Sequence, residues 1–279
     1  ILLLLMLLPC RMEARIISVS TSSALKTACT SAQPGDTIEA ANGVYNNTGS
    51  ITVTAKGTAE LPILIRAKSI GMAQLTGNSY FDFRQCEYIT VEGFLITSTQ
   101  ATVFKLQACN NVRITRNTLR LVETSSLKWI LIGGVWNDPN AMSHHNRIDH
   151  NLFENKSMAG NYITIDGSGE PTYKSSQYDR IDHNHFRNIG PRIVNEMETI
   201  RVGWSEMSLS SGFTTVEYNL FENCDGDPEI ISVKTCDNIV RYNTFVSSQG
   251  TLSIRHGNRT SVYGNFFFGG RKEGTGGIR

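Results

Sequence analysis

The sequence predicts an all-β protein, a right-handed parallel β-helix, from three observations. A short unit recurs along the chain, as in "RIDHNLF" at 147–153, "RIDHNHF" at 180–186 and "TVEYNLF" at 215–221. The units alternate β-branched with polar residues and are punctuated by Gly and Asn, whereas no long helical period is present. An Asn recurs at 117, 151, 184, 219, 243 and 265, with spacings of 34, 33, 35, 24 and 22 residues.

Those spacings describe a unit of roughly 22–24 residues that is sometimes lengthened by an insertion, as expected for coils of a solenoid with loops on one side. The recurring Asn is predicted to stack at a turn as a hydrogen-bonded ladder, and the Phe that follows it to stack in the core. The Leu/Asn consensus of a leucine-rich repeat is absent. Cys86 and Cys109 lie one repeat apart, so we expect them to stack as small buried residues.

The N-terminal elements differ from the coils. The apolar run at 1–8 is too short to span a bilayer and is typical of a secretory signal, so residues 1–14 are predicted to be a partial signal peptide and the protein to be secreted, extracellular or periplasmic. Residues 20–45 predict a short capped helix, a Pro-Gly-Asp turn and a strand, which would cover the open end of the solenoid. Residues 15–279 are therefore expected to be one β-helical domain, and the strand-like "GTGGIR" at the end predicts that further coils follow Arg279.

Composition limits the function classes. The 279 residues carry a net charge of +1, which argues against nucleic-acid binding because phosphate recognition needs a basic excess. Five cysteines beyond the signal include no CxxC pair, which argues against a zinc site. We expect a soluble monomer with no membrane contact after signal cleavage.

Four strand-like segments end on a cation, at Arg201, Lys234, Arg255 and Arg279. Within each, the residue before the cation is apolar and predicted to face inward, so the cation faces outward. Since neighbouring rungs lie about 4.8 Å apart, a shared register would line four like charges along one face, and such a face suits an anionic polysaccharide. The other interpretation is that the four cations are independently solvated.

An acidic stretch, "NCDGDPEII", lies beside these strands. Asp227 and Glu229 are two residues apart, so an extended backbone points both carboxylates to one side, and oxygen ligands suit Ca²⁺. Asn195 comes from the preceding coil. The alternative is that the acids only neutralise the cations. Glu229 and Lys234 are five residues apart, so placing both on one face requires a bend near Pro228 or Ile230.

Residues 195–279 resemble polysaccharide lyase family 6, the β-helical alginate lyases and chondroitinase B. The resemblance rests on "NEMETIRVG", "DPEIISVKTCDN", "SQGTLSIRHGNR" and "NFFFGGRKEGTGGIR". Weaker similarity reaches back to "PGDTIEAANGVY" and "GTAELPILIRAKS". "GTGGIR" is more similar to the alginate-degrading members.

The resemblance implies Ca²⁺-assisted β-elimination on alginate. It implies Lys234 as the base that removes the uronate C5 proton and Arg255 at the leaving O4. It also implies Ca²⁺ ligands at Asn195, Asp227 and Glu229, with Asp227 where a Glu is often expected. Subsite contacts are implied at Arg201, His256 and Arg279. Neighbouring cations would favour the neutral amine that a lysine base requires.

Other functions stay open from the sequence alone. They are a chondroitin or dermatan sulfate lyase, a mannuronan C5-epimerase, a β-helical glycoside hydrolase with paired carboxylic acids, and a non-catalytic β-helical carbohydrate-binding module. Trp136, Trp204 and Tyr162 could stack on sugar rings or be ordinary coil residues.

Overall fold

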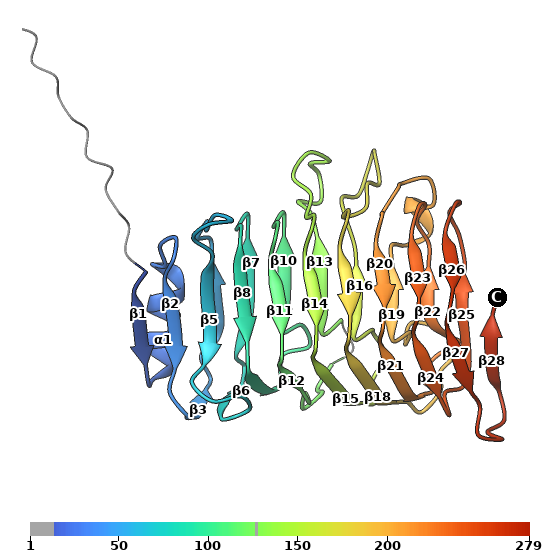
Figure 1. The fold of residues 1–279 in the computed structure, drawn as a ribbon, viewed down its shortest axis with the longest axis horizontal. Coiled ribbons are helices and arrows are strands. Elements are labelled where there is room, and N and C mark those ends of the chain that lie inside the picture. The colour runs from blue at the N-terminus through green and yellow to red at the C-terminus, as the bar shows by residue number, and fades with distance from the viewer. Residues whose placement is uncertain (1–13, 126–127) are drawn as a thin grey trace, which may run out of the picture.

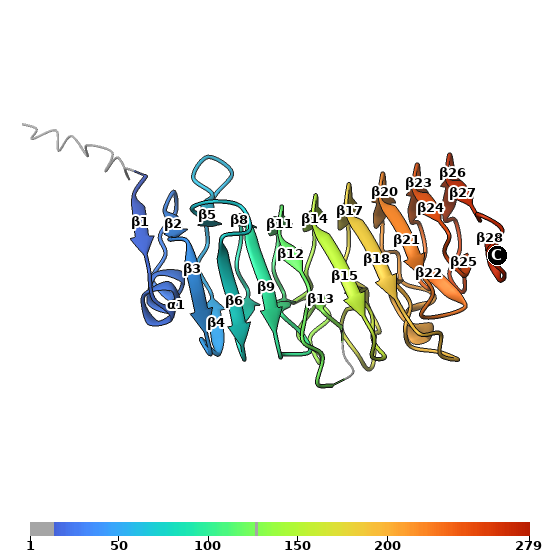
Figure 2. The ribbon, with the colours of Figure 1, turned by 90° about the horizontal axis from the view of Figure 1, so that it is seen from below.

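The computed structural model describes residues 14–125 and 128–279, and it is built from stacked coils. Figures 1 and 2 show these coils in a single row, from the N-terminal helix at one end to the last strand at the other. The predicted signal segment, apart from Ala14, lies outside the described residues. Within the described part, no helix is long and apolar enough to cross a membrane.

Three parallel sheets form the walls, with 10, 9 and 9 strands. Sheet A contains β1 (Ile16–Val19), β2 (Thr37–Ala40), β5 (Ile63–Ala67), β8 (Ile89–Glu92), β11 (Arg113–Thr115), β14 (Arg147–Asp149), β17 (Arg180–Asp182), β20 (Thr215–Glu217), β23 (Ile239–Arg241) and β26 (Ser261–Tyr263). Sheet B contains β3 (Gly43–Asn46), β6 (Ala73–Gly77), β9 (Phe94–Ser98), β12 (Thr118–Leu119), β15 (Leu152–Lys156), β18 (His185–Ile189), β21 (Leu220–Cys224), β24 (Thr244–Val246) and β27 (Phe266–Phe268). Sheet C contains β4 (Ser50–Val53), β7 (Tyr80–Arg84), β10 (Phe104–Gln107), β13 (Ile130–Gly133), β16 (Ile163–Ile165), β19 (Ile200–Val202), β22 (Glu229–Val233), β25 (Gly250–Ile254) and β28 (Thr275–Ile278). The predicted right-handed parallel β-helix is confirmed.

The predicted capping helix is α1 (Ser22–Thr30). The Thr21 hydroxyl accepts a hydrogen bond from the Ala24 N–H at 3.1 Å, which satisfies one of the free donors of the first turn. Leu25 and Cys29 point into the core, so the helix covers the first coil with its apolar face.

The Asn ladder is confirmed at the turn between sheets A and B. From β11 onward this turn has two residues, and the second is the recurring Asn. The side-chain N–H of one Asn donates to the side-chain Oδ1 of the Asn one coil later, as from Asn151 to Asn184 at 3.0 Å and from Asn184 to Asn219 at 3.0 Å. The following phenylalanines stack in the core, with Phe221 and Phe245 centroids 4.7 Å apart.

The other turns carry the insertions. Three consecutive coils have long loops between sheets C and A, at 134–146, 166–179 and 203–214, and the last contains the short 3-10 helix η1 (Ser205–Met207). The expected stacking of Cys86 and Cys109 is confirmed, with their sulfurs 3.3 Å apart and buried.

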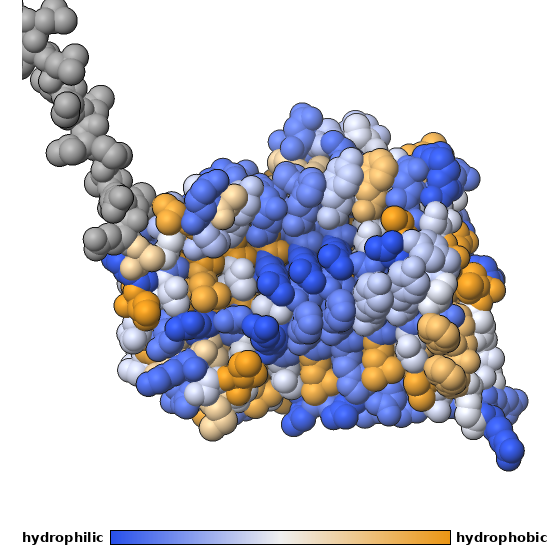
Figure 3. Space-filling model, in the orientation of Figure 1, coloured by the Kyte–Doolittle hydropathy of each residue, from blue (hydrophilic) through white to orange (hydrophobic). Residues whose placement is uncertain are grey.

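Sheet A has a polar outer face that is held by ion pairs between coils. Arg147 binds Asp182 at 2.6 Å, and Arg180 binds Glu217 at 2.6 Å. Figure 3 shows hydrophilic residues gathered in a band across this face. Its cations are therefore paired, which leaves sheet C as the face with the candidate site.

Candidate active site

The outer face of sheet C carries the residues that the sequence singled out. In β19, β22 and β25 the aliphatic residues are buried in the core and the alternate residues face outward. Register pairs Arg201 with Ser232 and Ser232 with Ser253, so these three form one row. The two serines are buried. They are small, and they form the floor of this part of the face.

The prediction that four cations share one register is wrong. Lys234 and Arg255 follow strand ends that are paired with each other, and so they share a row. Arg201 and Arg279 belong to the neighbouring row, because Arg279 donates to the Leu252 carbonyl at 2.9 Å and lies opposite Ser253. The cause is the register of the two strands. Ile200 pairs with Ile231, so Arg201 lies opposite Ser232, and it would lie opposite Lys234 only if the register were shifted by two residues. The four cations still lie on one face, in two rows.

Lys234 has an acidic neighbour that the sequence analysis missed. Its Nζ lies 3.6 Å from Oε1 of Glu198, and Glu198 is buried. The Asn161 amide donates to the other Glu198 oxygen at 2.8 Å and fixes the carboxylate. Lys234 therefore has a carboxylate partner from the preceding coil as well as Arg255 beside it in its row. The Lys234 side chain is 14% exposed, so a ligand on this face can reach it.

Glu198 occupies the same place in its coil as Glu229 does in the next. Because Ile200 pairs with Ile231, counting back two residues in each strand gives Glu198 and Glu229. Asn161 is the equivalent residue one coil earlier, two before Ile163. Alignment of the strands at this offset is the signal that would have found Glu198 in the sequence.

The bend predicted near Pro228 or Ile230 is confirmed. The pairing of β22 with β25 shifts register between Glu229 and Ile231, so Ile230 is an extra residue, a β-bulge. The bulge brings Glu229 to the outer face, where it accepts a hydrogen bond from Ser232 at 2.5 Å and from Arg255 at 3.2 Å.

Asp227 is the third buried acid of the group, beside Glu198 and Glu229. It is 3% exposed and accepts hydrogen bonds from the Met197 and Glu229 N–H groups. Burial raises the pKa of Asp227 to about 6, with added repulsion from Glu198 and Glu229. No cation pairs with Asp227 among residues 14–125 and 128–279. Three acids therefore meet with only Lys234 and Arg255 beside them.

Two residues of this group could contribute to a composite calcium site. Asp227 and Glu229 supply carboxylate oxygens, the ligands that Ca²⁺ prefers, and the negative charge left uncompensated around Asp227 favours a cation. No three Asp, Glu, His or Cys side chains of the described residues form a ready-made metal cluster, so further oxygens are required. Asn195 is exposed and lies two residues before Met197, which contacts Asp227.

The remaining predicted contacts lie at the edges of this group. His256 follows Arg255 and is half-buried, and its backbone N–H donates to Val233 at 3.1 Å. Tyr162 is buried in the core beside Trp129, so of its two predicted alternatives, stacking on sugars or being an ordinary coil residue, the structure supports the second. Trp136 and Trp204 are on the long loops, with ring centroids 5.3 Å apart.

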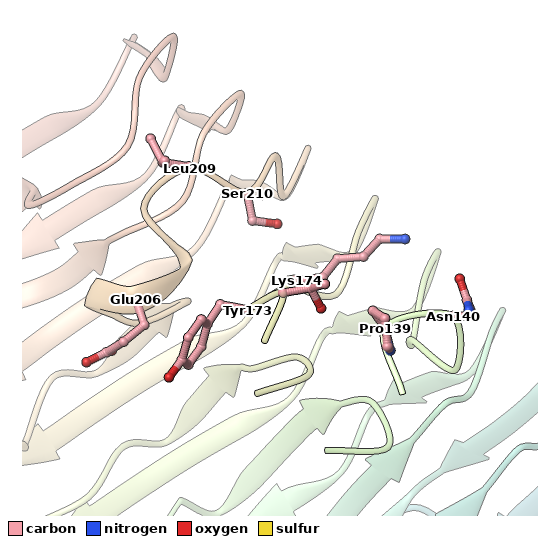
Figure 4. Close-up of a pocket in the computed structure, with 8 residues that line it drawn as sticks. Pro139, Asn140, Tyr173, Lys174, Glu206, Leu209 and Ser210 are labelled. Atoms are coloured by element: carbon pink, nitrogen blue, oxygen red, sulfur yellow. The ribbon is translucent and has the colours of Figure 1, made fainter. Parts of the chain in front are cut away.

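The long loops also enclose a hollow of about 460 Å³ at their outer ends. Figure 4 shows that Pro139, Tyr173 and Glu206 reach it from three successive loops. It contains none of the residues predicted for catalysis, which lie on the sheet itself.

Comparison with known proteins identifies the relatives of this chain. The sequence profile of the family described as Chondroitinase B matches residues 19–279. Comparison with curated proteins yields no match.

Solved structures provide several strong similarities. A PL6 family alginate lyase is 33% identical with a TM-score of 0.79, over 95% of this chain and 36% of that one. A mannuronic acid specific family 6 lyase from human gut microbiota is 29% identical with a TM-score of 0.79, over 95% of this chain and 61% of that one. A PL6 alginate lyase in complex with a trisaccharide is 25% identical with a TM-score of 0.77, over 95% and 56%. The chain thus spans between about a third and three fifths of the length of these relatives.

Proposed function

The chain belongs to the chondroitinase B family, and from this premise we propose that it is a polysaccharide lyase that cleaves alginate by β-elimination. One observation carries the proposal: Lys234 and Arg255 lie in one outward row of adjacent coils, each beside a carboxylate. The alginate lyases among the similar structures support alginate as the substrate. Action on a polymer agrees with the expected secretion, which we retain as part of the proposal.

In the proposed reaction, the neutral amine of Lys234 takes the C5 proton of a uronate. The electron pair of the C5–H bond forms the C4–C5 double bond, and the C4–O bond breaks. Arg255 would lie beside the leaving oxygen and stabilise its negative charge while that oxygen takes up a proton from solvent water. Arginine hardly deprotonates, so electrostatic stabilisation is its main contribution.

Glu198 has a positioning role in this scheme. Its carboxylate is held by Asn161 and lies 3.6 Å from the Lys234 nitrogen, so it fixes where that nitrogen lies and balances its charge once it has taken the proton. A lysine must lose its proton before it acts as a base. A cation bound at Asp227 and Glu229 would add positive charge close to Lys234 and favour the neutral amine.

Ca²⁺ would be held by Asp227 and Glu229, with Asn195 as the third protein ligand. When bound, it would neutralise the uronate carboxylate and stabilise the charge that develops as the C5 proton leaves.

The proposal is tested by the ultraviolet absorbance of the unsaturated product. Purified protein is incubated with alginate, and separately with dermatan sulfate, each with Ca²⁺ and with a chelator. Lys234→Ala is compared with Lys26→Ala, a matched change of an exposed lysine on α1. We expect a Ca²⁺-dependent rise on alginate that Lys234→Ala abolishes and Lys26→Ala leaves intact.

Other outcomes are informative. A rise on dermatan sulfate alone would retain the mechanism and change the substrate, and the family profile makes that the second candidate. No rise on either polymer, from protein with the circular dichroism of a folded β-helix, would contradict lyase activity of this chain.

A further inference from the structure

A second hollow lies on the outer face of sheet C, beyond Arg201 on the N-terminal side. It measures about 230 Å³ and covers β10, β13 and the end of β16. Register places Lys105, Leu131, Thr164 and Arg201 in one row across four coils, so the hollow continues the row that leads to the candidate active site. Glycines at 133, 134 and 167 line it, and a side chain on Gly133 would meet Asp166 and Gly167 of the lining, so glycine there keeps the hollow open.

Trp136 forms one wall of this hollow and is held in place by the two following loops. A Cβ on Gly169 would lie 2.1 Å from the Trp136 ring, so only glycine at 169 lets the indole lie across that loop. The indole reaches Trp204 of the third loop, with an angle of 45° between the rings. Trp136 nevertheless remains 47% exposed, so part of its surface is free to contact a ligand.

Polar groups at the hollow lack partners. Lys105 is exposed, and no ion pair joins it to any residue of 14–125 or 128–279. Arg201 lies in the same row, two coils from the lining residue Leu131, and its Nε is a buried donor without a hydrogen-bond acceptor in the described part of the chain. Buried donors are rarely left unpaired, so this one points to a ligand that supplies an acceptor.

Asp166 completes the lining. Burial raises the pKa of the Asp166 carboxyl, while the hydrogen bond from the Gly167 N–H and the charges of Arg201 and Lys128 oppose the change. Carboxylate oxygens accept hydrogen bonds, which suits sugar hydroxyl groups.

We propose that this hollow is a distal subsite that binds one ring of an acidic polysaccharide, stacked on Trp136, with its carboxylate toward Lys105. The inference depends on the proposed function and extends it. Lys105 and Arg201 are separated by three coil spacings, about 14 Å, a distance that a few sugar units span. An oligosaccharide held at Lys234 therefore reaches the hollow only if it is long enough.

The test measures binding and so does not depend on turnover. Isothermal titration calorimetry gives the dissociation constants of mannuronate trimer and hexamer on Lys234→Ala protein, in which cleavage is blocked. Lys105→Glu and Trp136→Ala are introduced into that background, with Lys26→Glu as the matched charge reversal on α1. Lys105 is exposed, so its variant folds even if removal of Trp136 loosens the loops.

We expect the hexamer to bind about tenfold more tightly than the trimer. Lys105→Glu should remove that advantage without changing trimer affinity, and Lys26→Glu should retain it. Equal affinity for both oligomers, or an advantage that survives both Lys105→Glu and Trp136→Ala, would overturn the subsite. If the wild-type protein had no lyase activity but affinity still increased with oligomer length, the subsite would stand and only the proposed reaction would be rejected.

Discussion

Asp179→Asn is expected to make the protein more stable at neutral pH. Asp179 is fully buried at the turn between sheets C and A, where its Oδ1 accepts from the N–H and the side-chain amide of Asn146. Its Oδ2 accepts from the Ser176 hydroxyl at 2.5 Å. No cation is paired with it in the described residues, so the charged form has hydrogen bonds but no counter-charge. Asparagine keeps the shape and the acceptor for Asn146, and it can donate to the Ser176 oxygen.

The magnitude follows from the pKa of this carboxyl. Burial raises the pKa of Asp179 from 3.8 to about 6. The folded protein then binds its proton more tightly than the unfolded chain, so stability falls as pH rises from about 4 to about 6 and stays lower above that range. The gap between the two values corresponds to a cost of about 3 kcal/mol at neutral pH. Asn carries no such cost, and below about pH 4 the protonated Asp carries none either.

Urea unfolding at pH 4.5, 6 and 7.5 tests this reasoning on wild-type and Asp179→Asn protein. The free energy of unfolding of the variant should exceed that of the wild type by up to about 3 kcal/mol at pH 7.5, and the difference should shrink steadily toward pH 4.5. A difference that is independent of pH, or a variant less stable than the wild type at pH 7.5, would refute it.

Two further changes test the stacking of the coils. Asn184→Ala should lower the unfolding free energy by about 4 kcal/mol. The change removes two hydrogen bonds that the side chain donates and two that it accepts, at about 1 kcal/mol each. A loss below about 1 kcal/mol, measured by urea unfolding, would contradict the ladder. Phe221→Ala should cost about 3–5 kcal/mol, because its ring is fully buried in the phenylalanine stack, whereas Phe268→Ala, 58% exposed, should cost under about 1 kcal/mol. Similar thermal shifts for both variants would count against that stack.

The fold was predictable because the β-helix repeats its signals. Asn at the two-residue turn and Phe behind it recur in successive coils, so each coil supports the interpretation of the next. The bend at Ile230 was also predictable, since Glu229 and Lys234 could share a face only if the strand broke its alternation.

The details of the site were harder to predict, because loop lengths hide strand register. Arg201 and Lys234 both follow an apolar residue, but the loop after Arg201 places it opposite Ser232. Glu198 was missed for the same reason. Tyr162 could not be recognised as a core residue because it directly precedes β16 and is buried together with the adjacent Ile163, which strand alternation does not predict.

The two-residue turn that joins sheets A and B from β11 onward has a consequence for how such a protein can change. That turn keeps the coils in step, while the turn between sheets C and A varies freely in length beside the binding face. Duplication of a whole coil would lengthen the face by about 4.8 Å and leave the ladder unbroken. Loop exchange would alter what the face recognises without moving the sheet beneath it. Reach and selectivity can therefore evolve separately, the first in whole-coil steps and the second one loop at a time.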